Sequence, residues 1–265
     1  MKKIYLFVVA ALALSVSVQA QTNIQEMYDF NRDQMTTTLE MFKPDNWGST
    51  FFFVDIYHTK NIAPTDFYVE IARSLNFWHN TPMKDFSLHA EWNGGCGIFP
   101  NYIGFGGYPV KNAWLFGAEY FFHSNDFKNT LTLEVLYKDI RNGESKLPLQ
   151  FTAVWGMNDL FGVKGLVFSG FADFWWENQV LANPEWNKLT LVQQALAAIQ
   201  GTPTPTVNTT GVFITEPQLW YNIGQHFHCD NLFIGGEVEI SSNFIGATNE
   251  KGWKVNPAAG IKWNF

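Results

Sequence analysis

Apolar and polar residues alternate along most of this chain, and the last eleven positions show the pattern most clearly. One face carries Val255, Pro257, Ala259, Ile261, Trp263 and Phe265, and the other carries Asn256, Ala258, Gly260, Lys262 and Asn264. A period of two residues predicts a β-strand with one apolar and one polar face. A soluble protein packs such an apolar face inward, whereas a transmembrane barrel turns it outward to lipid. Which of these arrangements applies decides the fold.

The same alternation predicts eleven further strands. We expect them at 24–31, 35–43, 49–57, 66–78, 86–93, 112–123, 131–138, 149–155, 163–176, 212–223 and 234–243. The segment 24–31 fits least well, because Glu26, Tyr28 and Phe30 would share a face. It is included because bacterial single-chain barrels have even strand numbers, and a segment folded into the lumen is the alternative. Within 66–78, Arg73 falls among the apolar positions.

The connections between the strands differ in length at the two ends. Starting from a periplasmic N-terminus, the periplasmic connections 44–48, 79–85, 124–129, 157–162 and 224–231 are short, whereas the opposite ones include 94–111 and 177–211. Short periplasmic turns and long extracellular loops are typical of outer-membrane barrels. The pattern favours an all-β fold, a transmembrane antiparallel up-and-down β-barrel of about 12 strands.

The long extracellular loop 177–211 also contains a helical pattern. Asn183 is a suitable cap, Pro184 suits a first helical turn and Gly201 a helix end. Leu189, Val192, Leu196 and Ile199 then form one apolar stripe. We expect a short helix packed over the barrel mouth, with a functional plug as the alternative.

Composition supports a membrane barrel. Aromatic residues make up 17% of the chain and charged residues 15%, against about 25% charged residues in typical soluble domains. An aromatic excess fits the two girdles of a membrane barrel. A secreted β-sandwich with a carbohydrate-binding face is the alternative.

Residues 1–20 resemble a secretory signal peptide. Lys2 and Lys3 precede the apolar run Ile4 to Leu14, and Val18-Gln19-Ala20 is a small-x-small cleavage site. The barrel domain would then comprise residues 21–265, in the outer membrane of a Gram-negative cell. Removing the two lysines leaves 15 basic and 24 acidic residues, a net charge of −9. This balance argues against nucleic acid as a partner.

The polar faces of the strands would line the lumen with acids and aromatic rings. The candidate solute-binding residues are Phe51, Phe53, Asp55, Tyr57, Tyr68, Glu70, His89, Glu91, Glu119, Phe171, Asp173, Trp175, Glu216, Trp220, Glu237 and Glu239. Glu40 and Glu134 add two further inward acids, against the lysines Lys138 and Lys262. Aromatic rings stack on bases or sugars, and carboxylates accept hydrogen bonds from hydroxyl groups. We expect Trp175 to stack on a base while Asp173 binds a ribose hydroxyl.

Three segments of the chain carry a family resemblance. The runs WGSTFFFVD at 47–55, SGFADFW at 169–175 and KWNF at 262–265 resemble the nucleoside-specific channel-forming porins (Tsx-like), a distant branch in particular. The resemblance implies a twelve-stranded monomeric barrel that takes up nucleosides. The helical pattern within 177–211 departs from that family and leaves the solute open. The terminal Phe265 resembles the residue that the outer-membrane assembly machinery reads.

Enzymatic, metal and redox chemistry find little support in the sequence. Ser87 and His89 share a face, but it is the lumen face, whereas an outer-membrane lipid enzyme needs them toward lipid. His226, His228 and Cys229 crowd one turn without the spacing of a metal site. We therefore expect no enzyme activity, cofactor or metal. Cys96, in an outer loop, and Cys229, in a periplasmic turn, should lie too far apart to pair.

Together these features predict an outer-membrane channel for passive uptake of small polar solutes, with nucleosides favoured. Its partners would be membrane lipid and a small-molecule solute. A cation-preferring or oligosaccharide porin is the nearest alternative. A structural or adhesive barrel and an outer-membrane lipid enzyme are alternatives of other classes.

Overall fold

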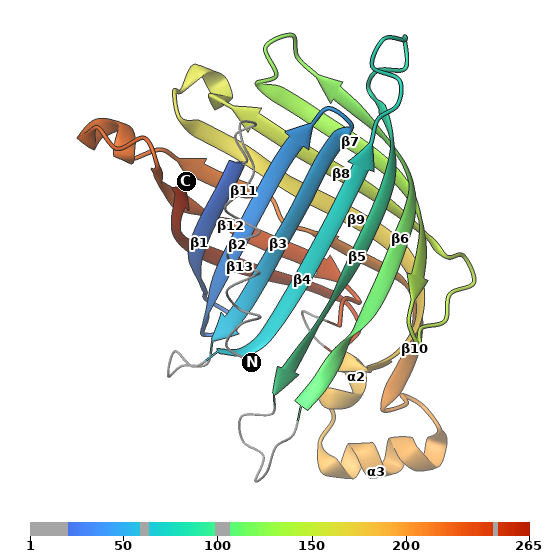
Figure 1. The fold of residues 1–265 in the computed structure, drawn as a ribbon. Coiled ribbons are helices and arrows are strands. Elements are labelled where there is room, and N and C mark those ends of the chain that lie inside the picture. The colour runs from blue at the N-terminus through green and yellow to red at the C-terminus, as the bar shows by residue number, and fades with distance from the viewer. Residues whose placement is uncertain (1–20, 59–63, 99–106, 246–248) are drawn as a thin grey trace, which may run out of the picture.

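One antiparallel sheet that closes on itself forms nearly the whole molecule (Figure 1). The computed structural model describes residues 21–58, 64–98, 107–245 and 249–265, so the expected signal peptide lies outside the described residues. The strands are β1 Gln21–Asp29, β2 Gln34–Asp45, β3 Gly48–His58, β4 Pro64–Leu75, β5 Phe86–Ile98, β6 Gly107–His123, β7 Asn129–Ile140, β8 Leu149–Asn158, β9 Leu166–Ala182, β10 Thr206–Thr215, β11 Gln218–Tyr221, β12 Leu232–Ser242 and β13 Trp253–Asn264.

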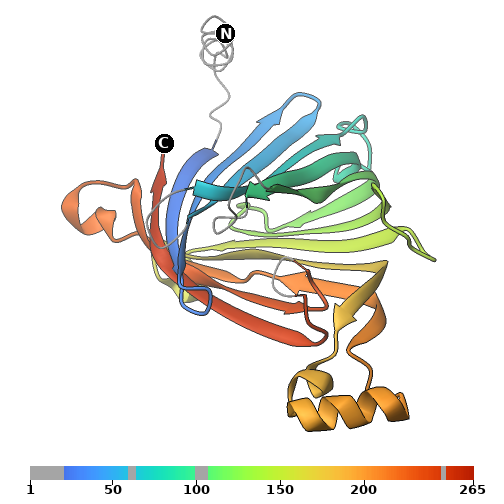
Figure 2. The ribbon, with the colours of Figure 1, turned by 90° about the horizontal axis from the view of Figure 1, so that it is seen from below.

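The sheet closes where the first strand meets the last. β1 pairs with β2 on one side and with β13 on the other, so the expected strand at 24–31 is present. Glycine is required at this seam, because a Cβ on Gly260 would lie 2.0 Å from the backbone oxygen of Glu26. In the view from below, β2–β5 lie opposite β10–β13 (Figure 2). The predicted closed up-and-down barrel is therefore confirmed.

The segments β10 and β11 are two parts of one barrel strand. Thr215 pairs with Ala172 of β9, and Gln218 pairs with Ser169, so the register continues across the gap. Both segments also pair with β12. The interruption falls at Glu216 and Pro217, where proline lacks the amide hydrogen that a ladder needs. The barrel thus has twelve strands, as the sequence predicts.

Burial along the strands is inverted relative to a soluble protein. Among the described residues, sixteen buried polar or charged residues outnumber eleven buried hydrophobic ones, while forty large hydrophobic side chains are exposed. On β13, Val255, Ile261 and Trp263 are exposed and Asn256 between them is buried. The apolar faces of the strands therefore point outward and the polar faces inward, as expected for a barrel in lipid.

Several strands are longer than the alternation predicts. β5 continues to Ile98 and β6 begins at Gly107, so the expected loop 94–111 shrinks to 99–106, which lies outside the described residues. The expected loop 177–211 shrinks to 183–205 for the same reason. We call this end of the barrel, which also carries 30–33, 141–148 and 243–252, the loop end. The other end, with 46–47, 76–85, 124–128, 159–165 and 222–231, is the turn end.

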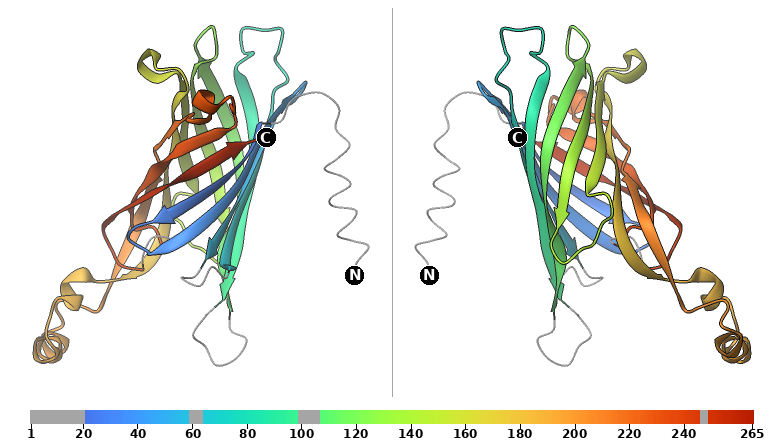
Figure 3. Two further views of the ribbon diagram at one scale, coloured as in Figure 1. Left: turned by 90° about the vertical axis from the view of Figure 1, so that its left-hand side faces the viewer. Right: turned by 90° about the vertical axis from the view of Figure 1, so that its right-hand side faces the viewer.

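The insert 183–205 holds two helices rather than one. Asn183 caps α2, Pro184–Asn187, and Thr190 caps α3, Leu191–Gln200, with Gly201 at the left-handed position that ends it. α3 hangs from the loop end, outside the strands (Figures 1 and 3). Its side chains Leu191, Val192 and Ile199 are 85%, 71% and 84% exposed. The prediction that a helix packs over the barrel mouth is therefore wrong.

The remaining helices are single turns at the turn end. η1 comprises Leu160–Gly162 and η2 comprises Gly224–Phe227. In the described part of the chain, no helix has the length and apolar character to cross a membrane.

Arg73, the misfit on the apolar face of β4, lies near the turn end. Its guanidinium donates two hydrogen bonds to the Asp45 carboxylate, at 2.7 and 2.9 Å, and a third to the Thr50 hydroxyl. The arginine thus joins β4 to the β2–β3 turn, where an outward charge reaches polar surroundings at the end of the strand.

Candidate functional site

The inward faces of the strands bring all sixteen predicted lumen residues to the inside of the barrel. On β4, β5 and β10 these residues share the face of a buried neighbour, namely Ser74, Asn93 and Ile214, and on β3 Asp55 and Phe53 contact the inward Thr38 and Tyr68. The lumen is therefore the candidate site. It divides into an aromatic patch, two groups of acids and two lysine–tryptophan contacts.

An aromatic patch formed by Phe51, Phe53 and Tyr68 lines the lumen on β3 and β4. The ring centroids of Phe51 and Phe53 are 6.0 Å apart, and those of Phe53 and Tyr68 are 5.9 Å apart. The Tyr68 hydroxyl donates to the Glu70 carboxylate at 2.6 Å. The patch therefore combines ring faces with a carboxylate, and both groups suit a flat solute that carries hydroxyl groups.

A first group of acids lies on β3 beside the aromatic patch and on the opposite wall. Asp55 of β3 accepts a hydrogen bond from Thr38 at 2.5 Å, while Glu216, between β10 and β11, and Glu237 of β12 face the lumen from the opposite wall. Glu237 accepts a further hydrogen bond from Gln218 at 2.9 Å. Carboxylates on both walls therefore make this part of the lumen electronegative.

The second group of acids surrounds His89 on β5. Its Nδ1 atom lies 2.8 Å from Glu119 and 3.7 Å from Glu134, and its Nε2 atom lies 3.3 Å from Glu91. All four side chains are buried or nearly so, at 5–12% exposure. The imidazole of His89 therefore lies within ion-pair distance of three carboxylates. Glu134 was expected to face inward but was not among the candidate binding residues.

Both inward lysines lie against tryptophan rings. The Lys138 ammonium lies 3.7 Å from the centre of a Trp175 ring, and the Lys262 ammonium lies 4.3 Å from that of Trp220. Trp175 is 6% exposed and Trp220 is 1% exposed. The expected stacking of a base on Trp175 is therefore wrong for this conformation, because Lys138 covers the ring and little of the side chain is accessible.

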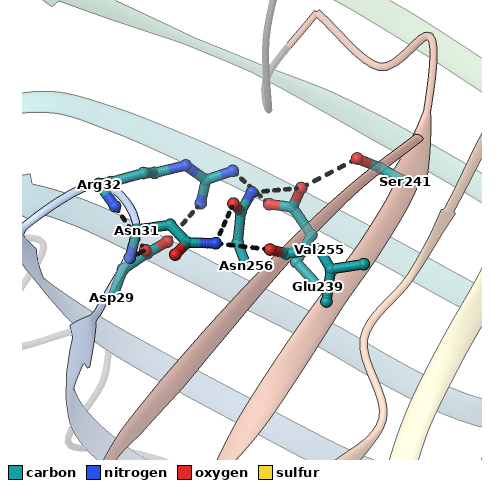
Figure 4. A network of polar contacts seen from close by, with 7 residues as sticks. All are labelled: Asp29, Asn31, Arg32, Glu239, Ser241, Val255 and Asn256. Carbon is teal, nitrogen blue, oxygen red and sulfur yellow. Dashed lines mark hydrogen bonds and ion pairs between the residues drawn. The ribbon is translucent and has the colours of Figure 1, made fainter. Parts of the chain in front are cut away.

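A network at the loop end was not found from the sequence (Figure 4). The β1–β2 connection turns inward, so that Arg32 binds Asp29 at 3.0 Å and Glu239 at 2.5 Å. Glu239 also accepts hydrogen bonds from Ser241 and Asn256. Arg32 lies in a turn, where the alternation of side chains that defines the inward faces does not apply.

A second ion pair was missed because its residues fell in expected loops. Lys111 of β6 binds Glu177 of β9 at 3.0 Å, and Glu177 also accepts hydrogen bonds from Trp175 and Gln179. Glu177 and Gln179 are buried. Continuing the two-residue alternation beyond Trp176 would have placed both on the inward face.

On the outer wall, a hydroxyl, an imidazole and a carboxylate meet. The Thr37 hydroxyl donates to Glu26 at 2.6 Å and lies 2.8 Å from His58 Nε2. In hydrolase triads the carboxylate orients the imidazole, but here Glu26 binds the threonine. His58 Nδ1 is buried without a hydrogen-bond partner in the described part of the chain. This contact therefore does not form a hydrolase triad, and the Ser87 and His89 pair of the sequence lies inside the barrel.

The cysteines are unpaired, as predicted. Cys96 and Cys229 are both free. Cys96 lies in β5 rather than in a loop, because that strand continues to Ile98. In the turn that carries Cys229, His226 lies 2.7 Å from the Tyr221 hydroxyl, so its imidazole has a protein partner.

The sequence of this barrel matches the model of one known protein family. The sequence model of a domain of unknown function, DUF5020, matches residues 20–265. The chain belongs to the DUF5020 family. No curated protein matches the sequence of this chain.

Solved structures of two porin-type proteins resemble this DUF5020 chain. One is described as "KdgM porin in complex with disordered oligogalacturonate", with a TM-score of 0.44 and 10% identity over 92% of this chain and 99% of that chain. The other is OccK2 (OpdF) of Pseudomonas aeruginosa, with a TM-score of 0.32 and 12% identity over 88% of this chain and 66% of that chain.

Proposed function

We propose that the protein is an outer-membrane channel for passive uptake of small polar solutes, with nucleosides as the favoured class. The observation that carries the proposal is the inversion of burial in a closed barrel. A wall with exposed apolar side chains needs lipid around it, and a polar interior needs water or a polar solute within it. Such a barrel joins two aqueous compartments without any covalent chemistry.

Aromatic side chains on the outer wall support a position in a membrane. Trp114 and Phe116 stack on β6, Phe174 and Trp176 pack edge to face on β9, and Phe213 lies against Trp253. These rings lie toward the loop end, while Trp47 and Phe77 pack together at the turn end. Two aromatic girdles, one at each membrane surface, are what an outer-membrane barrel carries.

The aromatic patch and its acids support a neutral solute that combines a flat ring with hydroxyl groups. Phe51 and Phe53 offer ring faces, and Glu70 and Asp55 accept hydrogen bonds. A base stacked on such a ring gains about 1–3 kcal/mol. Nucleosides satisfy both requirements, which is why we prefer them.

A neutral oligosaccharide is the second candidate. Sugars also stack on aromatic rings and donate hydroxyl hydrogens to carboxylates. The acids on both walls disfavour polyanionic sugars, since like charges repel. The choice between nucleoside and neutral sugar therefore depends on the shape of the passage.

Membrane residence is tested first. A closed barrel purified from outer membranes should require detergent and should migrate differently on a gel before and after boiling. Recovery as a soluble, detergent-free monomer that binds no lipid vesicles would refute the proposal at this level.

Solute passage is then measured by liposome swelling with a panel of nucleosides, neutral sugars and anionic sugars. Nucleosides should swell the vesicles fastest. The decisive variant is Phe53→Ala, expected to weaken nucleoside block of single-channel conductance by about ten- to a hundredfold. Phe52→Ala is its matched control, because Phe52 is the adjacent residue on the outward face. Equal swelling by all neutral solutes of one size would replace the nucleoside assignment with a general porin.

A further inference from the structure

Three neighbouring strands bring one imidazole and two carboxylates together inside the barrel. His89 of β5, Glu119 of β6 and Glu134 of β7 each offer one ligand atom, and these atoms all lie within 4.8 Å of one another. Glu119 and Glu134 are directly opposite each other in the β6–β7 ladder. Like charges in directly opposed positions destabilise a sheet, so this pair favours a positive charge beside it, which either a protonated His89 or a bound metal ion supplies.

The burial of the cluster increases the need of its carboxylates for a partner of positive charge. The His89, Glu119 and Glu134 side chains are only 5%, 11% and 8% exposed. In the described part of the chain, Glu134 accepts no side-chain hydrogen bond, and its ion pair with His89 Nδ1 is long, at 3.7 Å. A carboxylate that is more than nine-tenths buried and lacks a hydrogen bond is costly. A bound cation would give Glu134 the partner at bonding distance that the described residues do not supply.

The second ring nitrogen of His89, Nε2, already has a protein partner. His89 Nε2 lies 3.3 Å from Glu91, and Glu91 in turn accepts a hydrogen bond from Asn93 at 3.2 Å. Histidines that bind metals commonly donate their second ring nitrogen to a carboxylate, which fixes the tautomer and the ring orientation. With the proton on Nε2, a metal ion bound at Nδ1 would replace the proton that the 2.8 Å contact between Nδ1 and the Glu119 carboxylate otherwise requires.

We propose that His89, Glu119 and Glu134 bind a divalent transition-metal cation, with His89 Nδ1 and one oxygen of each carboxylate as ligands. One imidazole and two carboxylates suit Zn²⁺ or a similar borderline cation better than Mg²⁺ or Ca²⁺, which prefer all-oxygen sites. Toward the loop end, the fully buried Leu136 lies two residues from Glu134 and the fully buried Leu115 lies four residues from Glu119 on the same inward faces, so the site borders an apolar part of the interior. The proposal rests on the closed barrel and not on the channel function.

Zn²⁺ alone is the probe, titrated calorimetrically into the folded, chelator-treated protein in detergent. The background variant carries His226→Ala, His228→Ala and Cys229→Ser, which removes the other imidazole and thiol ligands at the turn end. We expect one equivalent of Zn²⁺ to bind this background. Glu134→Gln, which keeps the shape of the side chain, and His89→Gln should each abolish stoichiometric binding.

Two further variants separate a built site from general attraction to lumen acids. Glu91→Gln should weaken Zn²⁺ binding by about 10–100-fold, because it removes the partner that orients the imidazole. Glu40→Gln removes an inward carboxylate on β2, outside the cluster, and should leave the affinity unchanged. The shift in gel mobility on boiling shows that each variant is folded. The assignment is overturned if the folded background binds no Zn²⁺, or if Glu134→Gln and His89→Gln bind it as tightly as the background.

Discussion

At the scale of single residues, the lumen tryptophans Trp175 and Trp220 are buried against protein partners. The Trp175 indole donates to Glu177 at 3.3 Å and packs edge to face against Phe244, with ring centroids 6.0 Å apart. Lys138 covers the ring, a contact worth about 0.5–2 kcal/mol. The proposed contact with solute therefore involves the aromatic patch on β3 and β4 rather than Trp175.

Replacement of Trp175 should accordingly affect stability. We expect Trp175→Ala to lower the free energy of unfolding by about 3–5 kcal/mol, the usual cost of removing a buried large aromatic side chain. Urea titration of the folded barrel in lipid vesicles measures it. Trp176→Ala, on the outward face of the same strand, is the matched control. Unchanged stability together with weaker nucleoside block in Trp175→Ala would instead restore the stacking role.

A second prediction at this scale concerns pH. Asp159, in the β8–β9 turn, accepts hydrogen bonds from Lys128 at 2.6 Å and from the Gly165 amide at 2.8 Å. The Lys128 hydrogen bond, followed by that of Gly165, holds the pKa of Asp159 below its usual value of 3.8. A lowered folded-state pKa stabilises the fold above the unfolded-state pKa, and the contribution is lost as the pH falls through the folded-state value.

Asp159→Asn should therefore cause a small loss of stability at pH 7 that vanishes at low pH. Asparagine also tolerates the left-handed backbone at this position, where φ is 53°, so the variant changes charge alone. Urea midpoints for wild type and variant, measured from pH 7 to pH 2, give the comparison. A difference that persists undiminished at pH 2 would show that the ion pair is not its cause.

At the scale of elements, the helical insert is attached to the barrel by a narrow base. Ala182 of β9 pairs with Thr206 of β10, and the Asn183 amide donates to the Pro205 carbonyl at 2.9 Å. Asn187 of α2 donates to Glu250 at 2.7 Å. The apolar face of α3 is exposed, so the insert contributes little buried surface to the barrel.

We therefore expect the insert to be dispensable for folding. Replacing residues 184–204 with Asn-Gly should preserve the hairpin, because a two-residue type I′ turn matches the twist of paired strands. The variant should keep the gel shift on boiling and the urea midpoint of the full chain. An Asn187→Ala variant controls for the loss of the contact to Glu250. Failure of the shortened chain to form a heat-shifted band would show that the insert is needed for the fold.

At the scale of the whole molecule, the lumen carries an excess of negative charge. The ten expected inward acids are joined by Asp29 and Glu177, and the inward cations are Lys138, Lys262, Arg32 and Lys111 with His89. A passage walled by low-dielectric protein concentrates the field of these charges. The arrangement should attract cations and repel anions.

The ion selectivity of the channel tests whether negative charge predominates in the lumen. In a planar bilayer with a potassium chloride gradient, the reversal potential should show cation preference. The preference should weaken at 1 M salt, where the Debye length is about 3 Å rather than about 10 Å at 0.1 M. The double variant Asp55→Asn with Glu237→Gln should move the reversal potential toward zero, whereas Glu26→Gln on the outer wall should not. Anion preference in the wild-type protein would contradict the inferred charge of the lumen.

The sequence by itself determined which side chains face the lumen. Side chains along a strand alternate whatever the neighbouring strands are, so Phe53, Asp173 and Glu239 were placed correctly from local pattern alone. The twelve strands, the free cysteines and the closing strand followed from the same pattern.

Only the tertiary structure decided which of these residues meet. Strand ends depend on partners across the ladder, which is why β9 and β10 continue into an expected loop and bring Glu177 inside. The contacts of Lys138 with Trp175, and of His89 with Glu119 and Glu134, join different strands. These contacts form only in one register between the strands. Alternation does not specify that register, because shifting a strand by two residues keeps every side chain on the same face of the sheet but changes its neighbours.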